Sequence, residues 1–285
     1  MSSVLLLAIF SLHWVNAQDN PAYVIYNKAG RKSSFSKMEK AILEKKIVFF
    51  GESHNDPIAH WIQFLVLESL FEKHGEQLLV GSEMFERDNQ NILDAYQKGD
   101  LTAKQFEDSC RLWTNYKTDY KPMLLYANQH AIPWVATNIP RRYASMVFKK
   151  GLQALDTLSI DQKKWICPLP FPLDTTLTQY AALLDGEMHM GPTFVQAQAI
   201  KDATMAYSIA QALKPTTVFY HLNGSYHSDF HQGILWYLAR YSSLRFDDMI
   251  TISIVSQDNI QHLSREYIGK ADFIICVPET MTKTH

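Results

Sequence analysis

Six short apolar segments alternate with longer stretches that have the spacing of amphipathic helices. The apolar segments span residues 47–50, 77–83, 133–138, 216–222, 249–255 and 271–277. They read as continuous apolar runs, as expected for strands that are buried on both faces. Strands that are separated by helices form a mainly parallel sheet with helices on both faces. The sequence therefore predicts an α/β fold.

One region, about residues 155–192, breaks this alternation. Its run of prolines at 168, 170 and 172 excludes both a regular helix and a central strand. We interpret the region as an inserted helical lid with loops. It belongs to a single α/β domain that spans residues 18–285, and this length is sufficient for a large core.

The first 17 residues have the pattern of a secretory signal peptide. Residues 4–12 are mostly apolar, and Val15-Asn16-Ala17 is a small-residue cleavage pattern before a polar segment. The first three residues lack the usual Lys or Arg, and a buried N-terminal helix or strand is the alternative. We expect export to the periplasm or cell envelope. No cysteine near Ala17 offers a site for a lipid anchor, and the absence of another long apolar run predicts a soluble mature protein.

Composition and missing motifs argue against several function classes. The net charge of −2 without a basic patch makes nucleic acid an unexpected partner. The three cysteines form no Cys-x-x-Cys pair, so neither a disulfide framework nor a zinc thiolate site is expected. The chain also lacks the glycine-rich nucleotide motifs, Gly-x-Ser-x-Gly and His-Glu-x-x-His, which disfavours nucleotide binding, serine hydrolysis and zincin proteolysis.

Side chains suited to chemistry follow three of the predicted strands. Glu52 and His54 come after the first strand, Glu83 ends the second, and His227 follows the fourth. The carboxyl ends of parallel strands share one edge of a sheet, so we expect these residues to converge. They could bind a divalent transition metal, or position a water with a carboxylate as general base. The alternative is that each is a hydrogen-bonded structural residue.

Further residues could contact a haem group. His189, with Met188 and Met190 on either side, offers imidazole and thioether ligands of the kind that haem iron accepts. The methionines could instead fill gaps beneath the lid. Arg141 could bind haem propionates, or it could be a solvated charge in the first turn of a helix. The aromatic stretch 113–120 could form the wall of a planar ligand site or pack in the core.

Taken together, these motifs resemble the ChaN-like haem-binding uptake family, within the wider Tiki, TraB and erythromycin-esterase superfamily. The resemblance spans about residues 45–280. The segments that carry it are 51–54 (Gly-Glu-Ser-His), 83–88 (Glu-Met-Phe-Glu-Arg-Asp), 113–122, 138–141 (Asn-Ile-Pro-Arg), 197–206 and 224–227 (Gly-Ser-Tyr-His).

The resemblance implies an α/β fold, haem as ligand, and a role in iron acquisition with an outer-membrane haem or iron transport system. It also implies a homodimer that holds haem between subunits, with tyrosine as iron ligand. No tyrosine is singled out by motif, although Tyr226 and Tyr180 lie near candidate site segments. Related superfamily members are hydrolases that act with or without a metal, and their motif positions here are Glu52, His54, Glu83 and His227. We therefore expect an exported haem-binding protein, with a metal-dependent hydrolase as the alternative.

Overall fold

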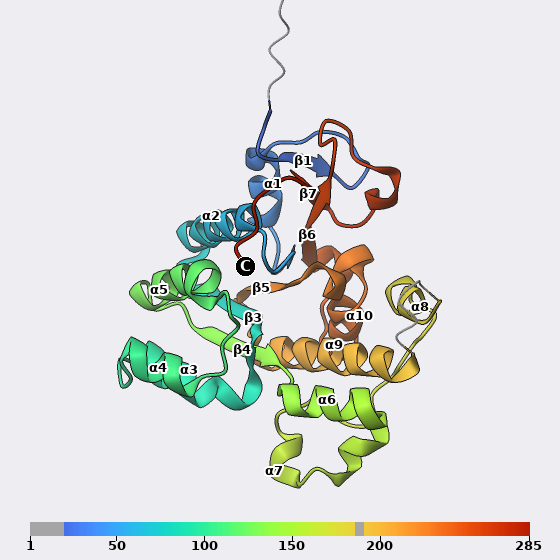
Figure 1. Cartoon of the computed structure of the whole chain (residues 1–285). Coiled ribbons are helices and arrows are strands. Elements are labelled where there is room, and N and C mark those ends of the chain that lie inside the picture. The colour runs from blue at the N-terminus through green and yellow to red at the C-terminus, as the bar shows by residue number, and fades with distance from the viewer. Residues whose placement is uncertain (1–19, 186–190) are drawn as a thin grey trace, which may run out of the picture.

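The computed structural model describes residues 20–185 and 191–285 and shows an α/β fold built on a seven-stranded sheet (Figure 1). The strand order across the sheet is β1-β7-β6-β2-β5-β3-β4. The strands are β1 (Val24–Asn27), β2 (Ile47–Glu52), β3 (Leu78–Glu86), β4 (Trp134–Asn138), β5 (Val218–Gly224), β6 (Met249–Gln257) and β7 (Phe273–Pro278). The prediction of an α/β fold with a mainly parallel sheet is confirmed.

All neighbouring strands pair in parallel except the edge strand β1, which pairs antiparallel with β7. The sequence analysis missed β1. The strand has four residues, and only Ile25 and Tyr26 in it are buried. The apolar run at residues 22–26 that contains most of this strand was overlooked, although it is at least as long as the run at 47–50 that was predicted as a strand.

Helices connect the parallel strands, and four of them, α1, α2, α4 and α7, begin at a side-chain cap. They are α1 (Phe35–Ile42), α2 (Pro57–His74), α3 (Gln90–Gln97), α4 (Ala103–Ser109), α5 (Lys121–Gln129), α6 (Arg141–Lys150), α7 (Ile160–Lys163), α8 (Thr178–Asp185), α9 (Pro192–Ala212) and α10 (Ile234–Tyr241). Asp56 caps α2 by accepting hydrogen bonds from the backbone N–H groups of Ile58 and Ala59, and Thr102 forms a capping box with Gln105 at α4.

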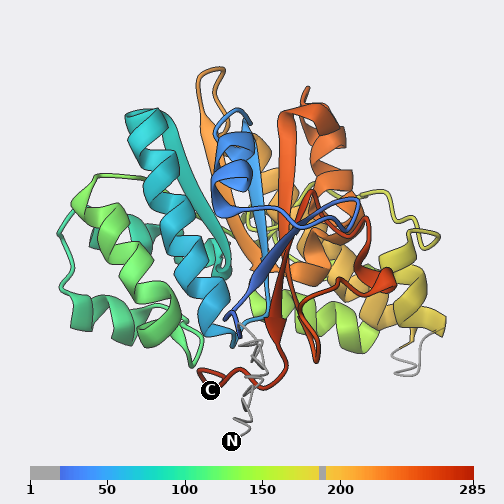
Figure 2. The same ribbon diagram turned by 90° about the horizontal axis from the view of Figure 1, so that it is seen from above.

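Helices cover both faces of the sheet (Figure 2). On β2, Val48 and Phe50 belong to the core layer shared with α1, α2 and α5, whereas Ile47 and Phe49 belong to the layer shared with α6, α9 and α10. This alternation is the two-residue period of a strand, and it explains why the central strands read as unbroken apolar runs.

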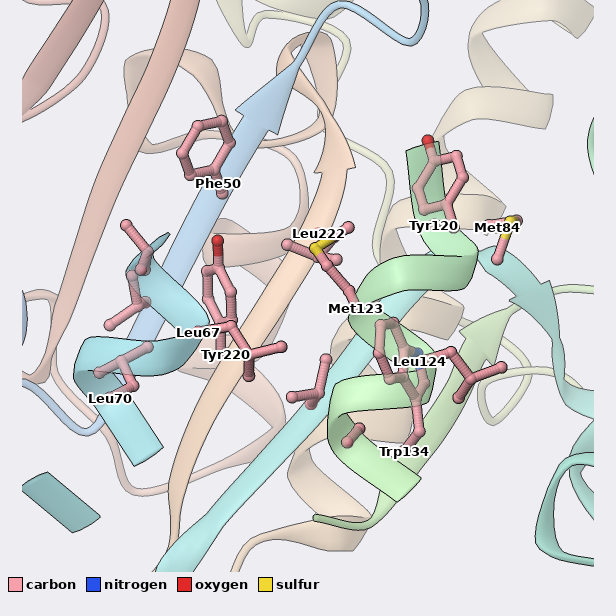
Figure 3. Close-up of a cluster of buried hydrophobic side chains, with 14 of the residues drawn as sticks. Phe50, Leu67, Leu70, Met84, Tyr120, Met123, Leu124, Trp134, Tyr220 and Leu222 are labelled. Carbon is pink, nitrogen blue, oxygen red and sulfur yellow. The ribbon is translucent and has the colours of Figure 1, made fainter. Parts of the chain in front are cut away.

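The layer on the α2 and α5 side contains large side chains that interlock between sheet and helices (Figure 3). Phe50, Tyr220 and Trp134 project from the strands, and Leu67 and Leu124 come from α2 and α5. All five are at most 1% exposed. Burying a side chain of this size stabilises the fold by roughly 1.5–3 kcal/mol, so this layer fixes the sheet on which the strand-end residues are mounted.

Two segments are irregular. Helix α10 begins only at Ile234, because the preceding Phe230 and His231 have φ of 56° and 59°, in the left-handed region that helices exclude. Between residues 155 and 185 the chain forms only the short helices α7 and α8 and loops. Among the described residues, no helix is long and apolar enough to span a membrane.

Candidate functional site

Glu52 and His54 form a hydrogen-bonded pair in the turn after β2. The His54 Nδ1 atom lies 2.8 Å from Oε1 of Glu52. The Glu52 side chain is buried, whereas the His54 side chain is 43% exposed. The carboxylate therefore fixes the orientation of an imidazole that remains accessible.

Three further side chains surround the Glu52 carboxylate. Gln63 and Tyr120 each donate a hydrogen bond to it, and His60 Nδ1 lies 3.9 Å from Oε2. Burial alone would raise the pKa of Glu52, but the hydrogen bond from His54 and the nearby imidazoles lower it overall. Burial alone would lower the pKa of His54, but its bond to Glu52 and the charges of Glu83 and Glu52 raise it overall. The pair thus favours an ionised carboxylate and a protonated imidazole.

The backbone of the same turn is held from the opposite side. The carbonyl oxygen of His54 accepts a hydrogen bond from Nδ2 of Asn115 at 2.6 Å and lies 3.1 Å from Nε2 of His60. Trp113 packs edge-on against the His54 ring, with centroids 4.6 Å apart. Trp113 and Asn115 come just before a short π-helical turn, Tyr116–Tyr120, so this irregular segment supplies one wall of the site.

The second predicted pair, Glu83 and His227, meets the first across the end of β5. The His227 Nε2 atom lies 3.3 Å from Oε1 of Glu83, and its Nδ1 atom lies 2.5 Å from Oδ1 of Asp202. Tyr180 donates a hydrogen bond of 2.6 Å to Oδ2 of Asp202. A buried row therefore runs from Tyr180 on α8 through α9 to Glu83 on β3.

The two carboxylates hold a charge on His227. Burial alone would lower the pKa of His227, but Glu83 and Asp202 raise it to about 10. Burial would likewise raise the pKa of Glu83, yet His227 holds it well below its usual range. For Asp202, burial outweighs the attraction of His227 and raises the pKa. With both ring nitrogens directed at carboxylates, His227 is an imidazolium at neutral pH.

Two glycines allow these groups to approach one another. A Cβ on Gly224 would lie 3.0 Å from Cε1 and Nε2 of His54 and 3.4 Å from Oε2 of Glu83. A Cβ on Gly51 would lie 2.8 Å from Cα of Ser225. The β3–β4 register also shifts between Ser82 and Glu86, an irregularity of the kind that re-aims side chains such as Glu83.

A cavity of about 720 Å³ opens above these residues. His54 and Glu83 line it, together with the aromatic rings of Trp113, Phe148 and Phe194. This volume lies within the usual range for small-molecule sites. The cavity is thus a site where a planar apolar ligand would meet an accessible imidazole.

Three cationic side chains also line the cavity: Arg111, Arg141 and Lys201. The adjacent Arg142 instead pairs with Asp88 and lies 5.3 Å from the Trp165 ring centroid. The position of Arg141 is therefore compatible with its predicted role near a ligand. Arg142 is held by its ion pair with Asp88.

Other predicted ligand residues do not line the cavity or lie outside the described residues. Met188, His189 and Met190 belong to the latter group. Tyr226 packs against the His227 ring, but its hydroxyl donates a hydrogen bond to the carbonyl of Gln179. None of the described residues of 155–185 lines the cavity, so the lid stays a prediction. Within the described chain, no group of three or more His, Cys, Asp or Glu is placed to hold a metal ion.

Sequence reasoning missed several residues that complete the site. His60 and Gln63 lie three residues apart on the buried face of α2. A polar pair at such a spacing among apolar residues could have been recognised in the sequence. Asp202 is the one acidic residue of α9, and it is buried. Tyr120 and Asn115 lie in the stretch 113–120 that the sequence singled out, but their contacts with Glu52 and His54 depend on an irregular segment and could not be read from it.

Comparisons with known proteins support the fold and identify the family. A search of curated proteins gave no match. Among solved structures, ChaN of Campylobacter jejuni, described with cofacial haem binding, is similar with a TM-score of 0.65 and 17% identity, over 90% of this chain and 98% of that one. An erythromycin esterase, the H289N mutant of EreC in an open conformation, is similar with a TM-score of 0.52 and 10% identity, over 92% and 98%. At these identities the structures show a shared fold.

The sequence itself matches a family model over residues 38–238, which is more than half of the chain. That match covers the Gly51–His54 turn, Glu83, Asp202 and His227, so the predicted resemblance is confirmed. The chain belongs to the haem-binding uptake family ChaN of the Tiki superfamily.

Proposed function

We propose that this protein is an exported haem-binding protein linked to haem or iron uptake, and that haem occupies the cavity at the carboxyl edge of the sheet. The observation that carries the proposal is the chemistry of the cavity wall. Its lining combines the aromatic side chains Trp113, Phe148 and Phe194 with three cationic side chains. Family membership supplies the ligand to which this chemistry is matched.

The side chains that line the cavity suit a porphyrin with two propionates. A porphyrin is planar and apolar on its faces, so aromatic side chains can contact it over a large area. Arg141 and Lys201 would pair with the propionates, whereas Arg111 is already paired with Glu86, its Nε lying 3.3 Å from Oε1. An arginine can bind a carboxylate through two hydrogen bonds. Haem bound here would supply an iron centre that accepts imidazole, thioether or phenolate ligands.

Titration of the purified protein with haem, followed by absorption in the Soret region, tests this assignment. We expect saturable binding that weakens several-fold in Arg141→Ala, because a rim ion pair contributes up to about 1 kcal/mol. The matched control is Arg142→Ala, which removes the neighbouring charge at a position paired with Asp88. Equal loss in both variants would argue against this cavity.

The aromatic wall is tested in the same assay. Trp113→Ala removes a ring that lines the cavity, and we expect roughly tenfold weaker haem binding from the lost contact area. Trp61→Ala is the control, because Trp61 is 49% exposed and packs on Tyr23. Unchanged affinity in Trp113→Ala would place haem elsewhere on the protein.

Export and partners complete the proposal. The apolar segment at residues 4–12 and the cleavage pattern ending at Ala17 support a mature chain that begins at Gln18. N-terminal sequencing of protein from fractionated cells tests this, and a chain that retains residue 1 would oppose it.

A homodimer and an outer-membrane transport system are the partners that we propose. Sedimentation with and without haem tests the homodimer.

A hydrolase is the second candidate, and the Glu52–His54 pair favours it. An imidazole that is oriented by a buried carboxylate and faces a cavity has the arrangement of a general acid or base. Asn138 Oδ1 and Gln198 Oε1 are buried without a hydrogen-bond partner in the described structure, and both residues line the cavity. Turnover of a chromogenic ester that collapses in Glu52→Gln would support this function, and elemental analysis would identify any required metal.

A further inference from the structure

A second cavity, of about 660 Å³, lies at the amino edge of the sheet and is here called the amino-edge cavity. Lys45 lies two residues before β2, Met249 is the first residue of β6, and Asp272 directly precedes β7. Since β2, β6 and β7 run parallel, these residues lie at the edge opposite to the one that carries His54 and Glu83. The volume is within the usual range for small-molecule sites, and no residue of this lining belongs to the first cavity. The amino-edge cavity is therefore a separate candidate site.

Two phenylalanine rings supply most of the exposed apolar surface of the amino-edge cavity. Phe230 and Phe246 are 37% and 47% exposed, and they line the cavity together with Met249 and Ile250. A planar apolar group placed against these rings would remove their exposed area from water. The wall is thus suited to an aromatic ligand.

The backbone that carries Phe230 is held in an unusual conformation. Phe230 and His231 have φ of 56° and 59°, in the left-handed region that bulky residues rarely occupy. The N–H of Phe230 donates to the carbonyl of Lys270 at 2.7 Å, and Nε2 of His231 lies 3.0 Å from Oδ2 of Asp272. The preceding Asp229 pairs with Nζ of Lys270 at 3.0 Å. These contacts fix a strained turn whose two strained side chains both line the cavity, and such strain is concentrated at binding and catalytic sites.

Two lysines give the amino-edge cavity a positive charge. Neither Lys28 nor Lys45 forms an ion pair with a residue that the structure describes. Lys45 Nζ donates a hydrogen bond of 2.6 Å to the carbonyl of Asp247, so its other N–H groups remain available. The Asp272 carboxylate in the lining is bonded to His231, and the Asp247 side chain is 87% exposed to solvent. Two ammonium groups beside aromatic rings suit a ligand whose ring carries an anionic group.

We propose that the amino-edge cavity is a second binding site, and that it takes a small planar aromatic molecule that carries a carboxylate, sulfonate or phosphate group. The aromatic ring lies against Phe230 and Phe246, and Lys28 and Lys45 pair with the anionic group. The site acts independently of haem, because its lining shares no residue with the first cavity.

Titration of the full-length protein with anilinonaphthalene sulfonate, followed by the fluorescence of this dye, tests the site. The dye is an aromatic ring system with one anionic group. We expect saturable binding that is about tenfold weaker in Phe230→Gly, because the ring contact is lost while glycine keeps the left-handed turn. Trp113→Ala, which alters the first cavity, is the control and should leave this binding unchanged.

The role of the lysines is tested with a matched pair of variants and a neutral dye. Lys28→Gln/Lys45→Gln should bind the sulfonate several-fold more weakly. The same variant should bind phenylnaphthylamine, which is the same ring system without the sulfonate, as the wild type does. The control Lys37→Gln/Lys40→Gln removes two exposed lysines of α1 outside the lining and should bind both dyes as the wild type does. Equal weakening in the two lysine variants would contradict the proposed pairing.

NMR signals of the histidine rings show where the dye binds. The signals of His231 should shift during the titration, whereas those of His262, an exposed histidine outside both cavities, should stay fixed. The inference is wrong if the wild type shows no saturable dye binding, if Phe230→Gly binds the dye unchanged, or if only Trp113→Ala weakens binding. Reversal of the His231 shift by stoichiometric haem would also contradict it.

A haem titration of Phe230→Gly separates this inference from the proposed function. It should match the haem titration of the wild type, because Phe230 lies outside the first cavity. Failure of haem binding therefore leaves the amino-edge site standing, and failure of dye binding leaves the haem site standing.

Discussion

The Nδ1 atom of His54 lies 2.8 Å from Oε1 of Glu52, and these two residues are only two positions apart in the chain. The short turn after β2 thus builds a complete carboxylate–imidazole pair. Gln63 and Tyr120 hold the carboxylate from beneath, so the imidazole is oriented before any ligand arrives.

Replacing Glu52 by Gln should lower the pKa of His54. The hydrogen bond and charge of Glu52 both raise this pKa in the folded protein, and the amide retains no charge. An NMR pH titration of the His54 ring measures the change. Glu72→Gln is the control, because Glu72 is exposed on the same helix as Gln63. An unchanged His54 pKa in Glu52→Gln would show that the pair does not form in solution.

Replacing His227 by Gln should destabilise the fold and change its pH dependence. Removing one partner of a buried ion pair costs about 3–5 kcal/mol, because Glu83 and Asp202 would remain without their cation. The folded-state pKa of His227 is raised from 6.5 to about 10, so its stabilising contribution is complete below pH 6.5 and is lost as the pH rises towards 10.

Urea unfolding between pH 6 and pH 10 measures this contribution. We expect the free energy of unfolding of the wild type to fall over that range, and the His227→Gln protein to lack this component. The control His262→Gln should follow the wild type. A wild-type curve that matches His227→Gln across the range would show that His227 is neutral in the folded state.

Replacing Tyr120 by Phe should cost roughly 1.5–3 kcal/mol, the usual contribution of a hydrogen bond to a charged group. The lost donor also raises the pKa of Glu52, so the stability that Glu52 contributes above its unfolded-state pKa becomes smaller. Tyr116→Phe is a matched control from the same π-helical turn, because Tyr116 is buried and the described structure shows no hydrogen bond from its hydroxyl. Equal losses in the free energy of unfolding in both variants would show that the hydrogen bond from Tyr120 to Glu52 makes no particular contribution to stability.

Replacing Gly224 by Ala should disturb the cavity more than the fold. The added methyl group would lie 3.0 Å from the His54 ring, so the ring must move. We expect displaced His54 NMR signals and weaker haem binding. Gly99→Ala is the control. It costs roughly 1–2 kcal/mol, because φ is +82° there, but it meets no atom within 4 Å. Unchanged His54 signals in Gly224→Ala would contradict the close packing.

The sheet and the ends of its strands could be predicted from sequence because they depend on local patterns. Continuous apolar runs marked the central strands, and parallel topology then required Glu52, Glu83 and His227 to share one edge. The short edge strand β1 was missed although residues 22–26 form such a run. The start of α10 depends on a contact distant in sequence, because the preceding His231 adopts a left-handed conformation and lies 3.0 Å from Asp272.

The partners of the site residues depend on packing between distant elements. Asp202 reaches His227 from α9, and Tyr120 reaches Glu52 from the irregular segment before α5. Neither spacing in sequence nor residue type specifies such pairs. Residues 279–285 are a similar case, because Lys283 and Thr284 contact the carboxylates of Asp56 and Asp119, which lie more than 160 residues away in the sequence.

Haem binding in the cavity is the central claim, and a stoichiometric titration tests it most directly. Purified wild-type protein is titrated with haem while the Soret band is recorded, alongside Trp113→Ala. The account predicts a saturable spectral change for the wild type and roughly tenfold weaker binding for the variant. No spectral change at stoichiometric haem, or identical titration curves for the two proteins, would contradict it.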